Sequence, residues 1–541
     1  MNVFSPSGFS RRRFMGTLGG AAAAAGLWRA SAAEDPDLVT VSVLHTTDLH
    51  GHITPTRTYA DDDGNFTDDL GGLARCATQI RAWQKENPNH VLLDIGDIYQ
   101  GTHVSLASRG QLMMRLLNSM KYDAWIIGNH EFDWGLQSFI DVVGTSTIPV
   151  LGSNCKYGGK WVNRLEEPGN PLSKVQPFIV KNVAGFKIGI IGTVTPGLPF
   201  WLAPRLLGDF SAEDPVKSID FAMKRLKAEK VDAIVLCSHM GLKGKGRPDD
   251  FANRINQIAA ENVGIDVIIA GHTHKDLGNE MVKGVPYTQA NYYGIHCGRV
   301  DLVFSKSQRK VMAVHPVTML MDKSVEQDPM ILSASAKERE ASAAELQRPI
   351  GELSALLSKE SAPGKPAETL LLLTRAMRHA LEKRSVRVDA VLHGNFYDFD
   401  IQPGRKTIAD AWEIVPYENY ISTAEFTREE LMVIAEECFN TSFSTQNFDG
   451  FKVTVEANGK KDVKVTDIAH PDGKPLDPAK RYRVALNSFD AQSGGRRYMK
   501  LREIVTGAEA KIQTHDIQSR EALIEFMTEK KSVGKKELGM V

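Results

Sequence analysis

The sequence predicts a two-domain α/β protein on three grounds. The chain has 541 residues, more than one ordinary hydrophobic core holds. Up to His274, apolar runs that end in Asp, His or Asn alternate with stretches of helical period. After about residue 320 the pattern changes to a polar, helical stretch followed by further helices and strands. We therefore expect a first domain at 38–320, a linker helix at 325–348 and a smaller α/β domain at 349–541.

Composition limits the class of protein. Hydrophobic residues make up 42% of the chain and charged residues 24%, the balance of a soluble globular protein. The net charge of −1 gives no global attraction to a nucleic acid polymer or an anionic membrane, and we expect neither partner. The five cysteines are widely spaced, and none forms a Cys-x-x-Cys pair. No disulfide framework is therefore indicated.

The N-terminus predicts an export signal over residues 1–33. Ser10-Arg11-Arg12-Arg13-Phe14-Met15 resembles the twin-arginine signal, and a mildly apolar stretch rich in Ala and Gly follows at Thr17–Trp28. Ala30-Ser31-Ala32 and Ser31-Ala32-Ala33 are both suitable cleavage sites. This stretch is too short and too weakly apolar to span a bilayer stably. We expect a periplasmic or secreted protein, exported folded by the twin-arginine machinery, without a stable membrane anchor.

The first buried strand is predicted at Val39–Thr46, and it precedes Asp48-Leu49-His50-Gly51-His52. Residues two apart on an extended segment point the same way, so Asp48 and His50 are predicted to reach one metal together. His52 continues that alternation, but Gly51 is expected to turn the chain first. His45 is expected to be a packed histidine rather than a ligand.

A surface loop is predicted at Tyr59–Leu70, where a calcium site is an alternative although the full EF-hand spacing is absent. A helix is predicted at Gly72–Lys85. The next buried strand, Val91–Asp97, ends in a carboxylate placed to bridge two metals. Asp94 lies earlier on that strand and is expected to be less exposed to a site at its tip.

The third strand is predicted at Trp125–His130, after an amphipathic helix at Leu106–Met120. Asn129 offers a neutral oxygen ligand. Asp133 follows His130 by three residues, which places it over the same face if a helix starts here. A carboxylate behind an imidazole fixes its tautomer and favours its protonated form. The alternative is a strand-to-helix turn capped by Asn129.

Four further strands complete the predicted first domain: Pro149–Asn154, Lys187–Thr195, Ala233–His239 and Val267–His274. The last two end in His239 and in the pair His272 and His274. Ligands at carboxyl ends of strands are typical of an α/β domain whose site lies outside the strand tips. In the second part of the chain, we expect helices at Asp328–Leu346, Glu368–Arg384 and Arg428–Cys438, and strands at Val388–Leu392 and Tyr482–Leu486.

The candidate ligands combine carboxylate, amide and imidazole groups. They are Asp48, His50, Asp97, Asn129, His239, His272 and His274. One shared carboxylate would divide them into two four-ligand sites. Mixed imidazole and carboxylate ligation suits Mn²⁺, Zn²⁺ or Fe rather than Ca²⁺ or Mg²⁺. Two such cations clamp an ester oxygen and lower the pKa of a bridging water.

These motifs resemble the binuclear metallophosphoesterases. Asp-x-His, Gly-Asp, Gly-Asn-His-Glu, a lone His and Gly-His-x-His occur in the family's order. Gly128-Asn129-His130-Glu131-Phe132-Asp133 and a second domain after a helical linker are similar to the 5′-nucleotidase branch. The resemblance implies a β-sandwich-type core flanked by helices. It also implies that Asp48, His50, Asp97 and His274 bind one metal, and that Asp97, Asn129, His239 and His272 bind the other.

The same resemblance implies a catalytic dyad of His130 and Asp133, and a second domain that holds the nucleoside. Tyr417 and Phe489 match the two aromatic residues that stack the base. The family's Asn-x-Gly-Gly-x-Arg segment reads His393-Gly394-Asn395-Phe396-Tyr397, so Asn395 is a candidate contact. The family's Gly-Gly-Asp-Gly reads Gly494-Gly495-Arg496-Arg497, which replaces a carboxylate with a cation suited to an anion. The alternative for these arginines is a solvated surface position.

The sequence therefore predicts an exported, two-metal phosphatase that hydrolyses a phosphate monoester of a nucleotide or related compound. One alternative keeps the enzyme and changes the bond to a phosphodiester, a nucleotide sugar or a thiosulfonate. The other is a periplasmic binding protein with a vestigial metal site, which the intact ligand set disfavours.

Overall fold

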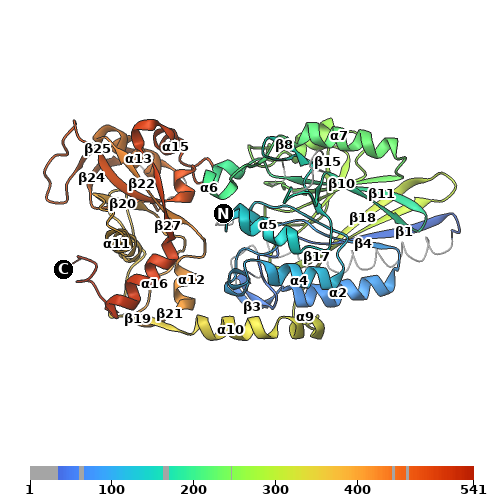
Figure 1. The fold of residues 1–541 in the computed structure, drawn as a ribbon, viewed down its shortest axis with the longest axis horizontal. Helices are drawn as coiled ribbons and strands as arrows, with labels where there is room; N and C mark the ends of the chain where they lie inside the picture. Colours follow the sequence, from blue (N-terminus) through green and yellow to red (C-terminus); the bar gives the residue numbers. More distant parts are fainter. Residues whose placement is uncertain are drawn as a thin grey trace. The chain divides into compact units, whose positions relative to one another are not determined.

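The computed structural model describes residues 35–59, 66–162, 170–244, 246–441, 445–457 and 462–540. The predicted export signal at 1–33 lies outside the described residues. The chain forms two compact units (Figure 1). The first comprises residues through Leu198 and Gly208–Arg339, and the second comprises Pro199–Leu207 and Glu340–Val541. The predicted α/β class with two domains is confirmed, although the sequence did not indicate that Pro199–Leu207 belongs with the second unit.

A seven-stranded sheet forms one layer of the first unit. Its strands, in spatial order, are β18 (Lys310–Leu320), β17 (His296–Ser305), β1 (Leu38–Thr46), β4 (His90–Asp94), β5 (Ala124–Ile126), β6 (Val150–Leu151) and β9 (Val175–Gln176). β1 runs parallel to β4, with Val43 opposite Val91. Because β1, β4 and β5 are parallel, their carboxyl ends lie at one edge of the sheet.

A six-stranded sheet forms the second layer. Its strands are β10 (Phe178–Val183), β11 (Phe186–Val194), β13 (Ala233–His239), β14 (Val267–Ala270), β16 (Val285–Ala290) and β15 (Asp276–Val282). Val43 and Val91 of the first sheet share a fully buried cluster with Val235 and Val267 of the second. The core of the first unit therefore lies between two packed sheets, as expected for a β-sandwich-type core.

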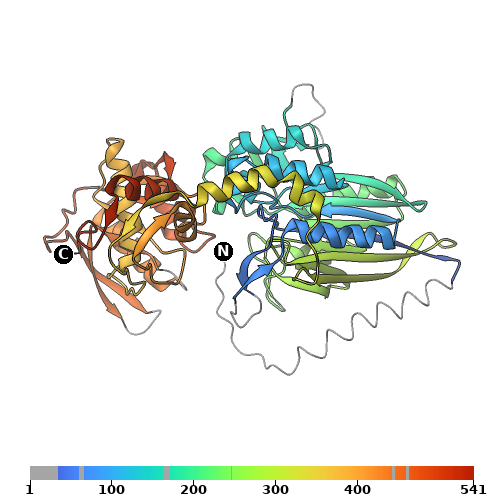
Figure 2. The same ribbon diagram turned by 90° about the horizontal axis from the view of Figure 1, so that it is seen from below.

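Helices cover the outer faces of both sheets (Figures 1 and 2). α7 (Pro215–Ala228) and α8 (Ile255–Glu261) pack on the six-stranded sheet through apolar residues such as Ile219 and Ile258. α2 (Leu73–Glu86), α4 (Gln111–Met120) and α5 (Leu136–Thr145) lie on the opposite side of the unit. The first unit thus has the predicted four-layer arrangement of helix, sheet, sheet and helix.

Two local predictions for the first unit were wrong. The helix predicted at Leu106–Met120 is two helices, α3 (His103–Ala107) and α4, because Arg109 and Gly110 have φ of 48° and 80°. A left-handed pair of residues ends a helix and turns the chain. The loop predicted at Tyr59–Leu70 is largely a hairpin of β2 (Thr56–Tyr59) and β3 (Phe66–Leu70), which pair antiparallel. The acidic run Asp61–Gly64 lies outside the described residues.

The second unit is built on a five-stranded sheet. Its order is β23 (Asn447–Asp449), β20 (Ala390–His393), β26 (Tyr482–Asn487), β22 (Tyr420–Phe426) and β27 (Gln513–Gln518). α11 (Glu368–Lys383) and α16 (Ser519–Lys530) contribute to one apolar cluster, and α13 (Arg428–Asn440) contributes to another. The predicted helices and strands of this part are confirmed within a few residues.

The predicted linker helix is two helices, α9 (Pro329–Ala334) and α10 (Ala336–Leu346). Asp328 caps α9, since its Oδ1 accepts hydrogen bonds from the N–H groups of Met330 and Ile331. All five cysteines are free and buried. Within the described ranges, no helix has the length and apolarity needed to cross a bilayer.

Candidate metal centre

Asp48 and His50 follow β1 on a segment that stays hydrogen-bonded to the chain after β4. The N–H of Asp48 donates to the carbonyl of Gly96 at 2.9 Å, and the N–H of His50 donates to the carbonyl of Asp97 at 2.9 Å. The predicted extended alternation is wrong here, because Asp48 and His50 have φ of 50° and 48°. The two side chains converge because each residue takes a left-handed turn, which costs conformational energy.

Asp97 lies at the centre of the candidate site. Its Oδ1 accepts a hydrogen bond from the N–H of His130 at 2.8 Å. Its Oδ2 lies 3.0 Å from Nε2 of His239 and 3.8 Å from Nε2 of His50. The neighbouring acid Asp94 faces elsewhere, since Thr46 Oγ1 donates to its Oδ2 at 2.6 Å. One carboxylate of the β4 strand end thus contacts residues from both sheets.

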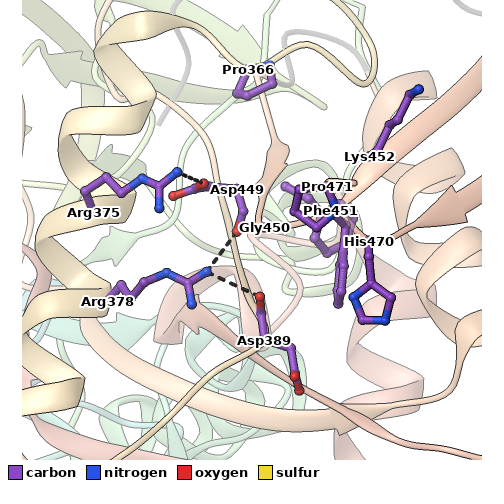
Figure 3. Close-up of a pocket in the computed structure, with 11 residues that line it drawn as sticks. Pro366, Arg375, Arg378, Asp389, Asp449, Gly450, Phe451, Lys452, His470 and Pro471 are labelled. Carbon is purple, nitrogen blue, oxygen red and sulfur yellow. Dashed lines mark hydrogen bonds and ion pairs between the residues drawn. The ribbon is translucent and has the colours of Figure 1, made fainter. Parts of the chain in front are cut away.

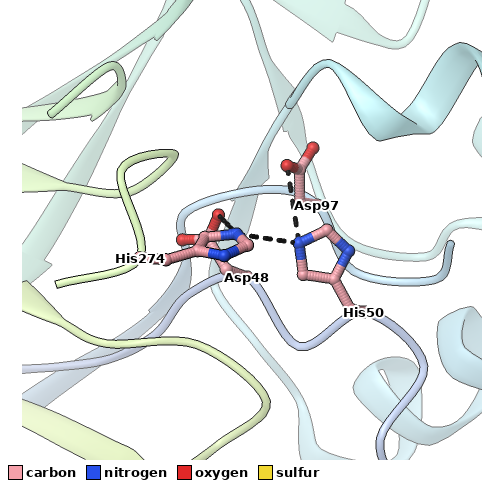
Figure 4. A group of neighbouring side chains, drawn as sticks. All are labelled: Asp48, His50, Asp97 and His274. Carbon is pink, nitrogen blue, oxygen red and sulfur yellow. Dashed lines mark hydrogen bonds and ion pairs between the residues drawn. The ribbon is translucent and has the colours of Figure 1, made fainter. Parts of the chain in front are cut away.

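The first candidate ligand set contains Asp48, His50, Asp97 and His274, whose ligand atoms all lie within 4.8 Å of one another (Figure 4). Nε2 of His50 lies 3.1 Å from Nε2 of His274, and the latter atom lies 3.4 Å from Oδ1 of Asp48. Imidazole nitrogens and carboxylate oxygens that face one point at such distances are arranged as metal ligands are.

The second candidate set contains Asp97, His239 and His272, also within 4.8 Å. His239 ends β13, and the N–H of His272 donates to Oδ1 of Asp48 at 3.0 Å. Asn129 precedes His130 and is 5% exposed. Its Oδ1 is buried and makes no hydrogen bond with the described residues. The structure therefore brings His239 and His272 of the six-stranded sheet to the same carboxylate as His50 of the other sheet.

Backbone strain is concentrated at these positions. Asp97, His272 and His274 have φ of 55°, 74° and 53° and, like Asp48 and His50, lie in the left-handed region that few non-glycine residues adopt. Such strain persists where the surrounding structure fixes the residue, and it is common at functional sites. Sequence patterns that assume regular strands do not predict it.

Backbone carbonyls orient two of the histidine rings. Nδ1 of His50 lies 2.7 Å from the carbonyl oxygen of Gln100, and Nδ1 of His239 lies 2.7 Å from that of Ile95. Each contact places a proton on Nδ1 and turns Nε2 towards Asp97. Neutral His50 therefore presents a lone pair to the cluster, whereas His239, which the carboxylates keep protonated, would present one only after a metal ion displaces its Nε2 proton.

Aromatic residues missed by the sequence analysis support the remaining histidines. The ring of Tyr292 stacks on His274 with centroids 4.8 Å apart, and Tyr293 stacks on His52 at 3.8 Å. His52 is thus a packed residue outside both ligand sets. His45 is fully buried, and burial lowers its pKa to about 3, which agrees with the prediction of a packed histidine. Adjacent tyrosines after a strand carry no sequence signal for such support.

Burial and charge set the protonation of the ligands. Burial lowers the pKa of His50 and of His272 to about 3, so both are neutral. Burial would also lower the pKa of His239, but the carboxylates of Asp97 and Asp48 outweigh it and raise that pKa to about 10. Burial favours protonation of Asp97, yet the neighbouring histidines hold its pKa well below the usual value. Asp48 and Asp97 are therefore both ionised.

His130 and Asp133 form a close pair beside the cluster. Nδ1 of His130 lies 2.7 Å from Oδ2 of Asp133. Burial would lower the pKa of His130, but the charges of Asp133 and Asp97 outweigh it and raise the pKa to about 9. His130 begins a short 3₁₀ turn, η1 (His130–Phe132), and Asp133 directly follows it, so the pair does not lie on the α-helix assumed from the spacing. The imidazole ring is 5.1 Å from that of His50, centroid to centroid.

Glu131, between them, is a buried support that the sequence analysis did not assign. Its Oε2 accepts hydrogen bonds from the N–H groups of Gly128 at 2.7 Å and Asp97 at 3.1 Å. Its Oε1 accepts one from Ile98 at 2.9 Å. The carboxylate therefore joins the chain after β4 to the chain after β5, which carries Asn129 and His130.

The residues present fit a pair of divalent metal ions. Oδ2 of Asp97 and Nε2 of His239 are fully buried and lie 3.0 Å apart without hydrogen-bond geometry. Nε2 of His130 is likewise buried and makes no hydrogen bond with any described residue. Buried polar atoms are normally satisfied, so Asp97 Oδ2, His239 Nε2 and Asn129 Oδ1, which lack hydrogen bonds among the described residues, fit the ligands of bound cations.

The predicted substrate residues lie in the second unit and have individual packing partners. Tyr417 meets Phe396 edge to face with centroids 5.6 Å apart. The guanidinium of Arg497 lies 5.6 Å from the ring centroid of Phe489. The guanidinium of Arg496, an exposed residue, lies 4.3 Å from the ring centroid of Phe200.

Asn395 is held by hydroxyl groups. Its side-chain amide donates to Thr369 Oγ1 at 2.9 Å, and its backbone N–H donates to Thr445 Oγ1 at 2.7 Å. Its Oδ1 is buried and makes no hydrogen bond within the described part of the chain. One acceptor of Asn395 is therefore left for a ligand or water.

Comparison with known proteins gives two family matches. Residues 41–276 match the calcineurin-like phosphoesterases, and residues 349–503 match the 5′-nucleotidase C-terminal domain. The chain is 26% identical to snake venom 5′-nucleotidase of Naja atra, over 85% of this chain and 91% of that protein. It is 23% identical to the trifunctional nucleotide phosphoesterase protein YfkN of Bacillus subtilis, over 92% of this chain but only 38% of that protein.

A solved structure has a similar fold. The 5′-nucleotidase precursor from Thermus thermophilus superposes with a TM-score of 0.68 and 24% sequence identity. The superposition covers 92% of this chain and 97% of that one. The likeness therefore extends over both units of the chain.

Proposed function

Because the chain belongs to the 5′-nucleotidase family, with a calcineurin-like phosphoesterase domain followed by a 5′-nucleotidase C-terminal domain, we propose that it hydrolyses a phosphate monoester of a nucleotide or related compound. Members of this family are metal-dependent phosphoesterases. The observation that carries the proposal is the convergence of two ligand sets on Asp97, with His130 beside them.

Two divalent ions fit the ligand sets. Asp48, His50, Asp97 and His274 would hold one ion, and Asp97, Asn129, His239 and His272 would hold the other. The donor set of imidazole, carboxylate and amide suits Mn²⁺, Zn²⁺ or Fe. When bound, such ions activate a water for attack and neutralise charge on the phosphoryl group.

His130 is the proposed transition-state stabiliser. Asp133 holds the proton on Nδ1 through the 2.7 Å contact, and its charge favours the imidazolium. Nε2 then carries a proton with no protein acceptor among the described residues. A buried cationic donor of this kind binds the phosphoryl oxygens more tightly as they gain charge, and that difference lowers the barrier.

Recognition of the leaving group is proposed for four residues of the second unit. Tyr417 and Phe489 offer aromatic faces for a planar base. Asn395 offers its Oδ1, which accepts no hydrogen bond from the described residues, as an acceptor. Arg496 offers a cation to a second anionic group beyond the scissile phosphate. This arginine therefore favours an alternative substrate that carries such a group, for example a nucleoside diphosphate derivative. The B. subtilis relative is named a trifunctional nucleotide phosphoesterase.

The deciding experiment is a hydrolysis screen of the metal-loaded protein. Mononucleotides, 2′,3′-cyclic nucleotides, nucleotide sugars, a thiosulfonate and p-nitrophenyl phosphate would be compared by kcat/KM. We expect a mononucleotide to rank first. A cyclic nucleotide, a nucleotide sugar or the thiosulfonate in first place would replace the monoesterase proposal, and no hydrolysis of any of them would favour the binding protein.

Export through the twin-arginine route is a separate proposal. It rests on Ser10-Arg11-Arg12-Arg13-Phe14-Met15 and on the apolar stretch that follows. Replacing both Arg11 and Arg12 with Lys should keep the charge and abolish export of the folded protein. Cell fractionation that found the double variant still exported would contradict this route.

A further inference from the structure

A cavity of about 520 Å³ opens in the second unit, and none of its lining residues belongs to the predicted substrate set. It lies among α11, the end of β23, the start of β24 (Lys452–Ala457) and the turn after β25 (Val463–Ala469). Figure 3 shows Arg375 and Arg378 on one side, with Phe451, Lys452 and His470 on the other. The volume is in the range of small-molecule sites.

Arg378 is held in place by backbone oxygens rather than by an acid. Its Nη1 donates to the carbonyl of Val388 at 2.6 Å, and its Nη2 donates to those of Asp389 at 3.4 Å and Asp449 at 3.3 Å. Its Nε is buried and has no hydrogen-bond partner among the described residues. No carboxylate of those residues forms an ion pair with Arg378, so its charge is fixed in position and not neutralised.

The two acids that line the cavity are already engaged. Oδ1 of Asp449 lies 2.9 Å from Nη2 of Arg375, and Asp449 is 4% exposed. Oδ2 of Asp389 accepts a hydrogen bond from the N–H of Arg483 at 2.8 Å, and its Oδ1 lies 3.9 Å from Nζ of Lys480. Each carboxylate is therefore paired with one cation, and the positive charge of Arg378 is not neutralised by either of them.

Lys452 adds a second uncompensated cation. It is exposed at the start of β24, and in the described ranges no carboxylate forms an ion pair with it. Between the two cations, Gly450 has φ of +119°, and a Cβ there would lie 2.9 Å from Nη2 of Arg378. A glycine thus lets the turn approach the guanidinium closely, and it keeps the cavity open between Arg378 and Lys452.

We propose that this cavity binds a small organic anion. Its phosphate or carboxylate group would accept hydrogen bonds from the remaining N–H groups of Arg378 and Arg375, within the field of Lys452. A planar guanidinium matches the geometry of either oxyanion. The two carboxylates that line the cavity pair with Arg375 and Lys480, so the positive charges of Arg378 and Lys452 are left for the ligand. The apolar part of the ligand would lie against Phe451 and Pro471, which line the opposite wall.

Calorimetric titration of the metal-loaded full chain tests the proposal. Phenylphosphonate and benzoate serve as probes, because they share a phenyl ring and differ in the oxyanion. Phenylphosphonate has a C–P bond in place of an ester bond, so a phosphoesterase does not hydrolyse it during the titration. Lys452→Glu should weaken binding at least about tenfold by placing like charge beside the anion. Arg378→Lys should also weaken binding, because an ammonium lacks the guanidinium fork. Lys464→Glu, an exposed charge reversal on β25 outside the cavity lining, is the matched control and should change affinity less than about twofold.

The outcomes separate the possibilities. Tighter binding of phenylphosphonate assigns a phosphate-bearing ligand, and tighter binding of benzoate assigns a carboxylate. Binding that survives both Lys452→Glu and Arg378→Lys but disappears in Asp97→Asn would place the anion at the metal centre and overturn the proposal. The proposal would also be overturned if neither probe saturated the protein at concentrations up to about 10 mM, because binding weaker than this is not specific. Lys452 makes no structural ion pair among the described residues, so its variant stays informative even if Arg378→Lys fails to fold.

Discussion

The backbone N–H of Asp97 donates to Oε2 of Glu131 at 3.1 Å, and this hydrogen bond joins the strand end that carries the central carboxylate to the one that carries His130. Glu131 is fully buried and accepts two more backbone hydrogen bonds, from Gly128 and Ile98. The geometry of the candidate site therefore depends on an acid that is itself outside both ligand sets.

Glu131→Gln should loosen the site without removing a ligand. The amide keeps the shape of the side chain, but its NH₂ group must face a backbone N–H that Glu131 now satisfies. An unsatisfied buried donor costs about 1–3 kcal/mol, and we expect a loss of unfolding free energy of that size together with weaker metal retention. Urea unfolding and elemental analysis after dialysis measure the two effects. Wild-type values in both would show that Glu131 does not position the site.

Asp97→Asn and His50→Ala should differ in their effect on metal content. Asp97 belongs to both ligand sets, so its variant should lose both ions, whereas His50 belongs to one set. We expect close to two transition-metal ions per wild-type chain, about one after His50→Ala and fewer after Asp97→Asn. Elemental analysis of matched preparations gives the stoichiometry. Full hydrolysis by a wild-type preparation without metal would refute the two-metal assignment.

His130→Ala should separate chemistry from metal binding. The proposed role of His130 is to donate from Nε2, and it is in neither ligand set. Loss of such a donor lowers kcat by roughly 10²–10³-fold, with metal content unchanged. Steady-state kinetics and elemental analysis on the same sample provide both readouts. A variant that loses its metals would instead make His130 a ligand.

The two-sheet fold and the convergence of the site residues follow from the sequence pattern. Apolar runs such as Val39–Thr46 and Ala233–His239 are strands, and the parallel strands of the two sheets bring Asp97 and His239 together at the same end of the sandwich. The left-handed conformations of Asp48 and His50 did not follow, because strand periodicity assumes an extended backbone. Nor did the role of Glu131, since its partners are backbone N–H groups that leave no trace in side-chain spacing. The packing of Phe200 with Arg496 joins segments nearly 300 residues apart, which local patterns cannot predict.

Asp328→Asn should lower stability at neutral pH and have a smaller effect in acid. Burial would raise the pKa of Asp328, but the N–H of Ile331 and the guanidinium of Arg81 outweigh it and lower that pKa. A lowered folded pKa adds stability above the unfolded value of about 3.9, and this stability is lost as pH falls through the folded pKa. We expect a difference of about 1 kcal/mol at pH 7 that shrinks below about pH 4. Urea unfolding of both proteins at each pH measures it, and a difference independent of pH would contradict the charge assignment.

Substrate recognition by the second unit is tested first by the aromatic pair. If Tyr417 and Phe489 hold a planar base, changing both to Ala should raise KM for the best nucleotide and leave kcat/KM for p-nitrophenyl phosphate unchanged. A nucleotide with an unchanged KM would exclude this pair from base recognition.

Arg496→Asp tests the proposed anion contact of the second unit, and the backbone conformation at this position tolerates the substitution. Arg496 has φ of +64°, a conformation that Asp adopts more readily than most residues, so the substitution adds little strain. The guanidinium has a cation–π contact with Phe200, which is worth about 0.5–1 kcal/mol at an exposed site. If Arg496 selects a second anionic group, the variant should lose affinity for substrates that carry one and gain relative preference for nucleoside monophosphates. Lys500→Glu, an exposed charge reversal on the following helix α15 (Met499–Thr506), controls for long-range charge. An equal change in ranking in both variants would assign the effect to net charge rather than to the position of Arg496.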